Sequence, residues 1–283
     1  MKKLTFIICF SIVSVLSAQL KHPKASPLSV TTQEVGLTSI KVEYSRPAVR
    51  GRKIFGGLVP YGRIWRVGAN ASTKITFEND VTIMGNVLEK GTYALYAFPE
   101  AEEWDIVFHE NLTHWGDGRK NYNPNEDVLR IKLVPGETKS FQENFLITFD
   151  KIQYNGLNLL LRWANTEIRI PIKIDTGSLM EIEIVKQLKD NPTAQTYYEA
   201  ARYYQEQHIK YGTALEYLKK AIELGGDTYY FYRVKSLVEA ALGDFKTAIS
   251  SAHKSMELAA LQDKDEFVRM NEKNIAKWKR LQE

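Results

Sequence analysis

The sequence predicts an α+β multidomain fold, in which an antiparallel β-sandwich or barrel-like domain precedes an all-α domain of helical repeats. Apolar and polar residues alternate across much of residues 26–175, which is the two-residue period of strands that bury one face. Beyond Gly177 the apolar residues recur every three or four positions, which is the period of an α-helix. We therefore expect a β domain at 19–176 and a helical repeat domain at 177–283.

Residues 1–18 have the pattern of an export signal. Lys2 and Lys3 precede an almost unbroken apolar stretch at 4–16, and the small residue Ala18 is typical of a cleavage site. The stretch is shorter than the roughly 20 residues that cross a bilayer as a helix. We therefore expect an exported protein, periplasmic or extracellular, whose mature chain has no membrane span.

The charge and the cysteine content exclude several classes of function. The net charge of +4 falls to +2 when Lys2 and Lys3 leave with the signal, which is too balanced for a general nucleic-acid-binding protein. The single cysteine, Cys9, lies within the signal, so the mature chain has no disulfide, thiol nucleophile or cysteine-ligated zinc. We expect neither a cofactor nor a bound metal ion.

The first half contains about ten short runs of alternating residues, separated by turn signals at the spacing of an antiparallel sandwich or barrel. The clearest runs are 104–108, 129–133, 145–149 and 168–174. Because Pro171 has no backbone N–H to donate, we expect its strand to lie at a sheet edge.

The second half contains a repeat with a period of 34 residues. Each of the apolar or small residues Tyr211, Ala214, Leu218, Ala221 and Leu224 has a counterpart 34 positions later, in Phe245, Ala248, Ala252, Ser255 and Leu258. The period resembles the tetratricopeptide repeat, and Gly243-Asp244-Phe245 matches the turn that this family places between paired helices. The resemblance covers two repeats at about 193–260.

Further helices would complete the stack, because about three repeats are needed for a stable solenoid. We expect one helix before the repeats, at 179–188, and a capping helix after them, at 265–281, with a polar outer face. Asp227 and Asp244 are predicted N-caps, since an aspartate carboxylate accepts from the orphan N–H groups of a helix start.

One segment departs from the even mixture of charges elsewhere. Residues 45–76 contain seven basic side chains and no carboxylate, together with several glycines and aromatic residues. Arginine forks beside aromatic faces suit an anionic or glycan ligand. The candidate ligand-binding residues are Arg46, Arg50, Arg52, Tyr61, Arg63, Trp65 and Arg66. The alternative is structural, with arginine stems that cover apolar surface and pair with carboxylates on other strands.

Two histidines, His109 and His114, invite comparison with a zinc site. They are five positions apart, whereas the zinc-protease motif needs two histidines four apart on a helix. A looser site from His109, His114 and Asp117 is geometrically allowed, although histidines in surface loops are commonly unliganded. No spacing of carboxylates or serines identifies a catalytic group.

Several separated motifs resemble one known family. They are similar to a secreted bacterial family catalogued as domain of unknown function 2911. The matching positions are 51–56 (GRKIFG), 60–70 (PYGRIWRVGAN), 91–95 (GTYAL), Pro99 and the run from Trp104 to Trp115-Gly116. The similarity covers about residues 25–174. It implies a compact, mostly β domain in an exported protein and carries no activity with it.

These observations together predict a non-enzymatic exported binding or scaffold protein of the cell envelope. The helical repeats would bind a protein or peptide partner, and the β domain would bind an anionic or glycan ligand. The competing hypothesis is a hydrolase or lyase acting on an envelope glycan or polar small molecule, with His109 or His114 in proton transfer. A third hypothesis is that the helices only stabilise the β domain.

Overall fold

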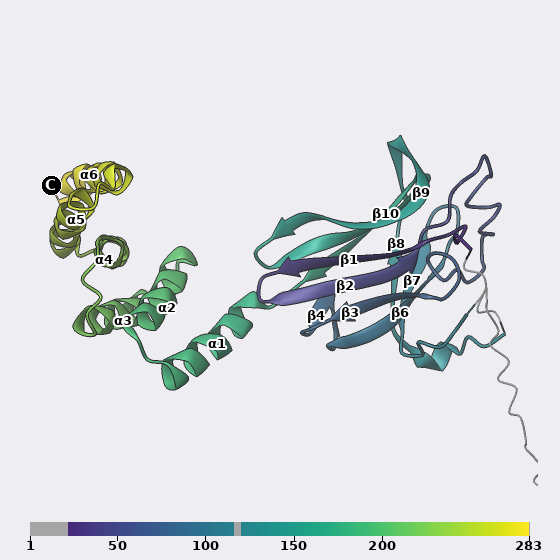
Figure 1. Ribbon diagram of the computed structural model, residues 1–283, viewed down its shortest axis with the longest axis horizontal. Helices are drawn as coiled ribbons and strands as arrows, with labels where there is room; N and C mark the ends of the chain where they lie inside the picture. Colours follow the sequence, from purple (N-terminus) through teal and green to yellow (C-terminus); the bar gives the residue numbers. More distant parts are fainter. Residues whose placement is uncertain (1–21, 116–119, 283) are drawn as a thin grey trace, which may run out of the picture. The chain divides into compact units, whose positions relative to one another are not determined.

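The computed structural model describes residues 22–115 and 120–282. The chain divides into two compact units, one ending at Asp175 and the other beginning at Thr176 (Figure 1). The first, here called the β unit, is antiparallel, and the second, the helical unit, contains paired helices. The predicted fold class is therefore confirmed. The expected signal at 1–18 lies outside the described residues.

The larger sheet of the β unit has six antiparallel strands in the order β1-β2-β3-β6-β7-β8. They are β1 (Leu28–Val35), β2 (Thr38–Ser45), β3 (Thr73–Phe77), β6 (Gly91–Phe98), β7 (Trp104–His109) and β8 (Asp127–Leu133). A short 3-10 helix, η1 (Pro124–Glu126), leads directly into β8. Alternation of buried and part-exposed residues along β2 and β3 gives this sheet one face toward the core.

The smaller sheet has the order β5-β4-β10-β9. Its strands are β4 (Val81–Ile83), β5 (Asn86–Leu88), β9 (Gly136–Gln153) and β10 (Gly156–Lys173). β9 and β10 form a hairpin of two 18-residue strands, longer than the short strands expected from sequence. The register of the β9–β10 pairing shifts at three places along these strands, as happens at β-bulges and similar irregularities.

The expectation that Pro171 marks an edge strand is wrong. β10 is an interior strand, paired with β9 on one side and β4 on the other. The proline is tolerated because the pairing with β9 ends at Glu167 opposite Gly136, so no β9 residue lies opposite Pro171.

The two sheets face one another across an aromatic core, and they do not close into a barrel. Trp104 of β7 packs near Phe55, which also contacts Trp163 of β10, and Trp65 packs against Phe145 of β9. The sheets are also joined by polar contacts, since the buried Tyr44 hydroxyl donates to the carbonyl of Ile147 at 3.1 Å.

The helical unit consists, within the described residues, of six helices. They are α1 (Thr176–Asp190), α2 (Ala194–Glu206), α3 (Tyr211–Glu223), α4 (Tyr229–Ala241), α5 (Phe245–Ala260) and α6 (Asp265–Gln282). α2 packs on α3, α4 on α5, and α5 on α6. No helix of the described chain is long and apolar enough to cross a membrane.

The 34-residue repeat coincides with α3 and α5. Ala214 and its counterpart Ala248 are completely buried, and so are Leu218 and its counterpart Ala252. Small side chains at matching positions let paired helices approach closely, which explains why the repeat appears in the sequence.

Candidate functional site

The basic segment, residues 45–76, begins at the last residue of β2 and extends into β3, and β9 contacts its first loop. The Val49 N–H donates to the Glu143 carbonyl at 2.8 Å, and the Arg50 N–H donates to the Glu143 carboxylate at 2.9 Å. Arg50 and Gly51 both have positive φ, 50° and 69°, so the chain makes a tight left-handed turn here. This turn directs the arginine-rich loop around one end of the aromatic core.

The loop encloses a cavity of about 380 Å³, here called the Arg/Trp cavity. Arg50, Arg52 and Arg66 lie on its wall, with Trp65 and Trp163 among its other lining residues. No carboxylate belongs to the described residues that line it. Three arginines and no carboxylate among the described lining residues favour a positive potential at the cavity wall.

The polar atoms of the cavity wall are oriented by backbone contacts. Arg52 donates from Nε to the Val49 carbonyl at 2.9 Å and from Nη2 to the Ala48 carbonyl at 2.6 Å. Trp65 donates from Nε1 to the Gly68 carbonyl at 3.2 Å, and Trp163 donates to the Glu143 carbonyl at 3.3 Å. Since a guanidinium has five donors, Arg52 keeps donors for a ligand while its position is constrained.

The structure places the seven predicted residues in two groups. Arg50, Arg52, Trp65 and Arg66 line the cavity. The remaining predicted residues do not belong to its lining: Arg46 donates from Nε to the Phe145 carbonyl at 2.9 Å, Tyr61 is 43% exposed beside Gly56, and Arg63 is exposed.

Two features of the cavity differ from the sequence-based expectation. Trp65 is not a free platform, because it is only 6% exposed and stacks on Trp163 with ring centroids 5.9 Å apart. Trp163 itself was missed, because it lies far from the basic segment in the sequence. Only the approach of β10 to the basic segment brings this ring to the cavity.

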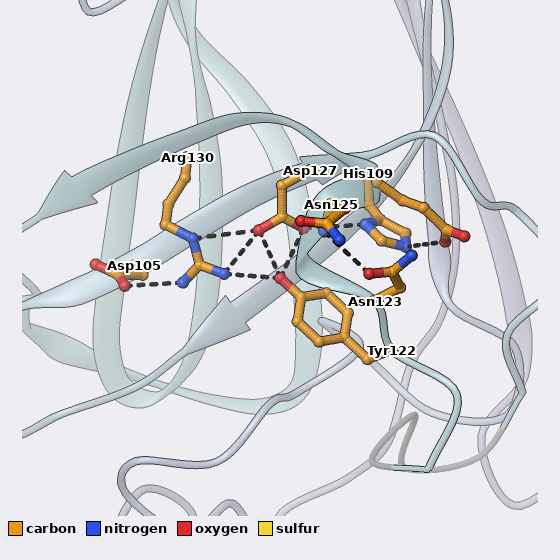
Figure 2. A network of polar contacts seen from close by, with 8 residues as sticks. Asp105, His109, Tyr122, Asn123, Asn125, Asp127 and Arg130 are labelled. Atoms are coloured by element: carbon orange, nitrogen blue, oxygen red, sulfur yellow. Dashed lines mark hydrogen bonds and ion pairs between the residues drawn. The ribbon is translucent and has the colours of Figure 1, made fainter.

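A second polar cluster lies where β7 ends and β8 begins (Figure 2). His109, the last residue of β7, is completely buried, and its Nδ1 lies 3.0 Å from Oδ1 of Asp127, the first residue of β8. Tyr122 stacks on the His109 ring with centroids 5.1 Å apart, and Tyr96 of β6 contacts it edge-on at 5.4 Å. The imidazole is thus held in one orientation by two rings and a carboxylate.

Asp127 is in turn held by its neighbours. The Tyr122 hydroxyl donates to Asp127 at 2.6 Å, and Arg130 donates from Nη2 to Asp127 at 2.8 Å and from Nη1 to Asp105 at 2.9 Å (Figure 2). Burial and the Asp127 carboxylate raise the pKa of Tyr122 above its ordinary value, so the phenol keeps its proton and donates.

Three side chains converge beside this network and form what we call the histidine site: His109, His114 and Glu126 of η1. One potential ligand atom from each lies within 4.8 Å of the others. Among the described residues, Nε2 of His109, Nδ1 of His114 and Oε2 of Glu126 are buried and have no hydrogen-bond partner. Nε2 of His109 lies 3.1 Å from Oε2 of Glu126, but this contact does not have hydrogen-bond geometry.

The histidine site differs in one member from the looser site that the sequence allowed. His109 and His114 are brought together, whereas Asp117 lies outside the described residues. Glu126 was missed because seventeen positions separate it from His109. The pairing of β7 with β8 brings it close, together with the hydrogen bond from the Glu110 N–H to its carbonyl at 3.0 Å.

A family model described as a protein of unknown function (DUF2911) matches residues 26–172, which is more than half of the chain and nearly all of the β unit. No match was found among curated proteins.

Proposed function

The chain belongs to the DUF2911 family of unknown function, and we propose that it is a non-enzymatic, exported binding protein whose β unit captures a small anionic ligand. Export is proposed from the signal pattern at residues 1–18, and the cell envelope or its exterior is the proposed location. Envelope glycans that carry carboxylate or sulfate groups have the required chemistry.

The observation that carries this proposal is the lining of the Arg/Trp cavity. Its volume of about 380 Å³ lies in the range of small-molecule sites, which combine apolar and aromatic walls with a few oriented polar groups. Arginine forks bind carboxylate and sulfate through paired hydrogen bonds. The buried and mutually stacked rings of Trp65 and Trp163 would form a rigid wall behind these arginines.

Binding is a better proposal than hydrolysis for this cavity. The enzymatic hypothesis requires His109 or His114 beside the arginines, and neither histidine is among the described residues that line the cavity. Arginines and tryptophans without a proton-transfer group can hold an anion but provide no general acid or base.

Tryptophan fluorescence of the full chain tests this proposal, because Trp65 and Trp163 line the cavity. We expect galacturonate and sulfate to change the emission saturably and glucose to leave it unchanged. The double variant Arg50→Gln/Arg66→Gln should bind at least about tenfold more weakly, since hydrogen bonds to charged groups each contribute roughly 1.5–3 kcal/mol.

The control is Arg63→Gln, which removes one arginine charge from the same segment outside the cavity. Its affinity for the anion should stay within about twofold of the unchanged chain. Equal weakening by Arg63→Gln would show that the arginines act only through the general surface charge. Either that result or saturable binding of glucose would contradict the proposal that the cavity binds the anion.

For the helical unit we propose a tetratricopeptide-like stack that binds an extended peptide. A groove of about 570 Å³ runs along α2, α4 and α6. Its aromatic lining residues are Tyr198, Tyr229, Tyr230 and Phe267. The 34-residue period and the buried small residues of α3 and α5 support the repeat assignment, and solenoid repeats bind partners along such extended surfaces.

The charge of the groove favours an acidic, aromatic peptide. Arg233 lies in the groove and donates to the neutral Asn271 side chain at 3.1 Å. Burial lowers the pKa of Arg233, and the nearby Glu266 carboxylate offsets this only in part, so the partly desolvated charge would be stabilised further by a carboxylate of the peptide. Arg202 lies in the same groove, where Glu206 already pairs with it at 2.7 Å.

Fluorescence anisotropy with a labelled peptide of alternating tyrosine and aspartate tests the groove. We expect saturable binding, no binding of the tyrosine–lysine counterpart, and at least about tenfold weaker binding to the Arg233→Gln variant. Arg269→Gln, an exposed arginine of α6 outside the groove, is the control. Comparable losses in both variants, or equal binding of both peptides, would contradict the proposal.

A further inference from the structure

We propose that the histidine site binds a divalent transition-metal ion through Nε2 of His109, Nδ1 of His114 and Oε2 of Glu126. This inference is independent of the proposed function, because none of the three residues lines the Arg/Trp cavity. It also departs from the expectation of no bound metal that followed from the sequence.

The first argument is the state of the three donor atoms. Each is buried and lacks a hydrogen bond within the described part of the chain, although buried polar atoms are nearly always paired. One unpaired atom costs about 1–3 kcal/mol. The three residues that carry these atoms bring one potential ligand atom each within 4.8 Å of the others. A cation bonded to all three lone pairs removes that cost at once.

The second argument is the separation of two of the donors. Nε2 of His109 and Oε2 of Glu126 lie 3.1 Å apart without hydrogen-bond geometry. Bonds of about 2.0–2.2 Å at angles of roughly 90–110° place two donors of one ion about 2.8–3.6 Å apart. These two atoms are therefore spaced as neighbouring ligands.

The third argument is the support behind His109. Its Nδ1 lies against the Asp127 carboxylate, so the proton belongs on Nδ1 and Nε2, which lies near Glu126, keeps its lone pair. Tyr122 and Arg130 hold Asp127 in place. A carboxylate that orients a ligating histidine is the usual outer partner of a protein metal site.

A metal-free arrangement accounts for only part of this geometry. A doubly protonated His109 could lie between the Asp127 and Glu126 carboxylates, at 3.0 and 3.1 Å. That arrangement leaves the buried Nδ1 of His114 without a partner among the described residues. The metal satisfies both histidines, and so it explains more of the site.

The donor set indicates which ion would bind. Two imidazoles and one carboxylate suit Zn²⁺ and similar first-row ions, whereas Ca²⁺ and Mg²⁺ prefer sites made entirely of oxygen. Three protein ligands leave at least one coordination position for water or another small ligand.

The test uses the full chain, freed of metal with a chelator and then titrated with Zn²⁺ by calorimetry and with Co²⁺ by visible absorption. We expect one ion per chain and a Co²⁺ spectrum of four or five coordination. Nitrogen-15 NMR of the unchanged protein should show zinc-dependent shifts of His109 Nε2 and His114 Nδ1, which needs no variant. Absence of the Co²⁺ spectrum or of these shifts overturns the proposal.

Three variants compare the Zn²⁺ affinity after loss of a proposed ligand, of the residue that supports a ligand, and of a histidine outside the site. His114→Gln should weaken Zn²⁺ binding by more than about 100-fold, and Asp127→Asn by about 10–100-fold, the usual effect of losing an outer partner. His253→Gln, an exposed histidine of α5, should leave affinity unchanged. Unchanged Zn²⁺ affinity in a folded His114→Gln variant would overturn the site.

Discussion

At the scale of single residues, the two predicted helix caps had different outcomes. Asp244 is the N-cap of α5, and its carboxylate accepts from the Thr247 N–H at 3.0 Å as expected. The prediction for Asp227 is wrong, because Thr228 occupies the N-cap position of α4. The Asp227 carboxylate instead interacts with Tyr232, whose pKa is raised by burial and by this contact. A helix start displaced by one residue is beyond what sequence spacing resolves.

The Asp244 cap predicts a pH-dependent contribution to stability. Hydrogen bonds from the Thr247 side chain and backbone lower the pKa of Asp244 below its ordinary 3.8, so the folded state favours the carboxylate. The stabilisation is complete above the ordinary pKa and is lost as the pH falls through the lowered folded value. Asp244→Ala should therefore lower the Tm of the helical unit at neutral pH and much less in strong acid.

Asp244→Asn is the matched control for the charge. Asparagine caps helices about as well as aspartate, so its Tm should stay near that of the unchanged chain at neutral pH. Thermal unfolding monitored by circular dichroism across the acidic range measures both variants. The role of the carboxylate would be contradicted if the Tm difference between the alanine variant and the unchanged chain were the same at every pH.

At the scale of elements, the spacing of apolar residues predicted whether a segment is a helix or a strand, but it did not predict where a strand lies within its sheet. Alternation identified the strands, and the 34-residue repeat identified α3 and α5, because both patterns follow from which side chains each element buries. The prediction from Pro171 was wrong because a proline is excluded from an interior strand only at positions where the neighbouring strand would accept a backbone N–H. The end of β9 at the opposite position was not visible in the sequence.

Alanine substitution should have opposite effects on stability at two glycines, Gly226 between α3 and α4 and Gly212 within α3. A Cβ at Gly226 would lie 2.0 Å from Cε2 of Phe231 and 2.7 Å from the Ala221 carbonyl, so Gly226→Ala must displace packed atoms. Overpacking of this kind costs about 1–3 kcal/mol. Gly212 of α3 has nothing within 4 Å of such a Cβ, so Gly212→Ala should be neutral or stabilising by up to about 1 kcal/mol.

Urea unfolding of the two variants, followed by far-ultraviolet circular dichroism, measures this contrast. Gly226→Ala should lower the midpoint for the helical unit, and Gly212→Ala should leave it unchanged or raise it. Equal effects of the two substitutions would show that Phe231 can move aside at no cost.

At the scale of the whole molecule, each unit has a buried core of its own. The β unit is centred on tryptophans and phenylalanines between its sheets, and the helical unit on clusters around Tyr198, Leu218 and Phe231 and around Ala252 and Trp278. Separate cores imply separate unfolding transitions. In calorimetry, the Gly226→Ala variant should therefore shift only the transition of the helical unit. A shift of both transitions would support the hypothesis that the helices stabilise the β unit.

The sequence by itself determined the class of each unit and the segment that supplies the four predicted residues of the Arg/Trp cavity. These features follow from local periodicity, charge density and turn residues, which each segment carries regardless of its neighbours. Tertiary structure alone decided that Trp163 completes the cavity and that Glu126 and Asp127 join His109. Such groups meet through strand pairing between distant segments, and pairing depends on how the sheets bury their apolar faces together.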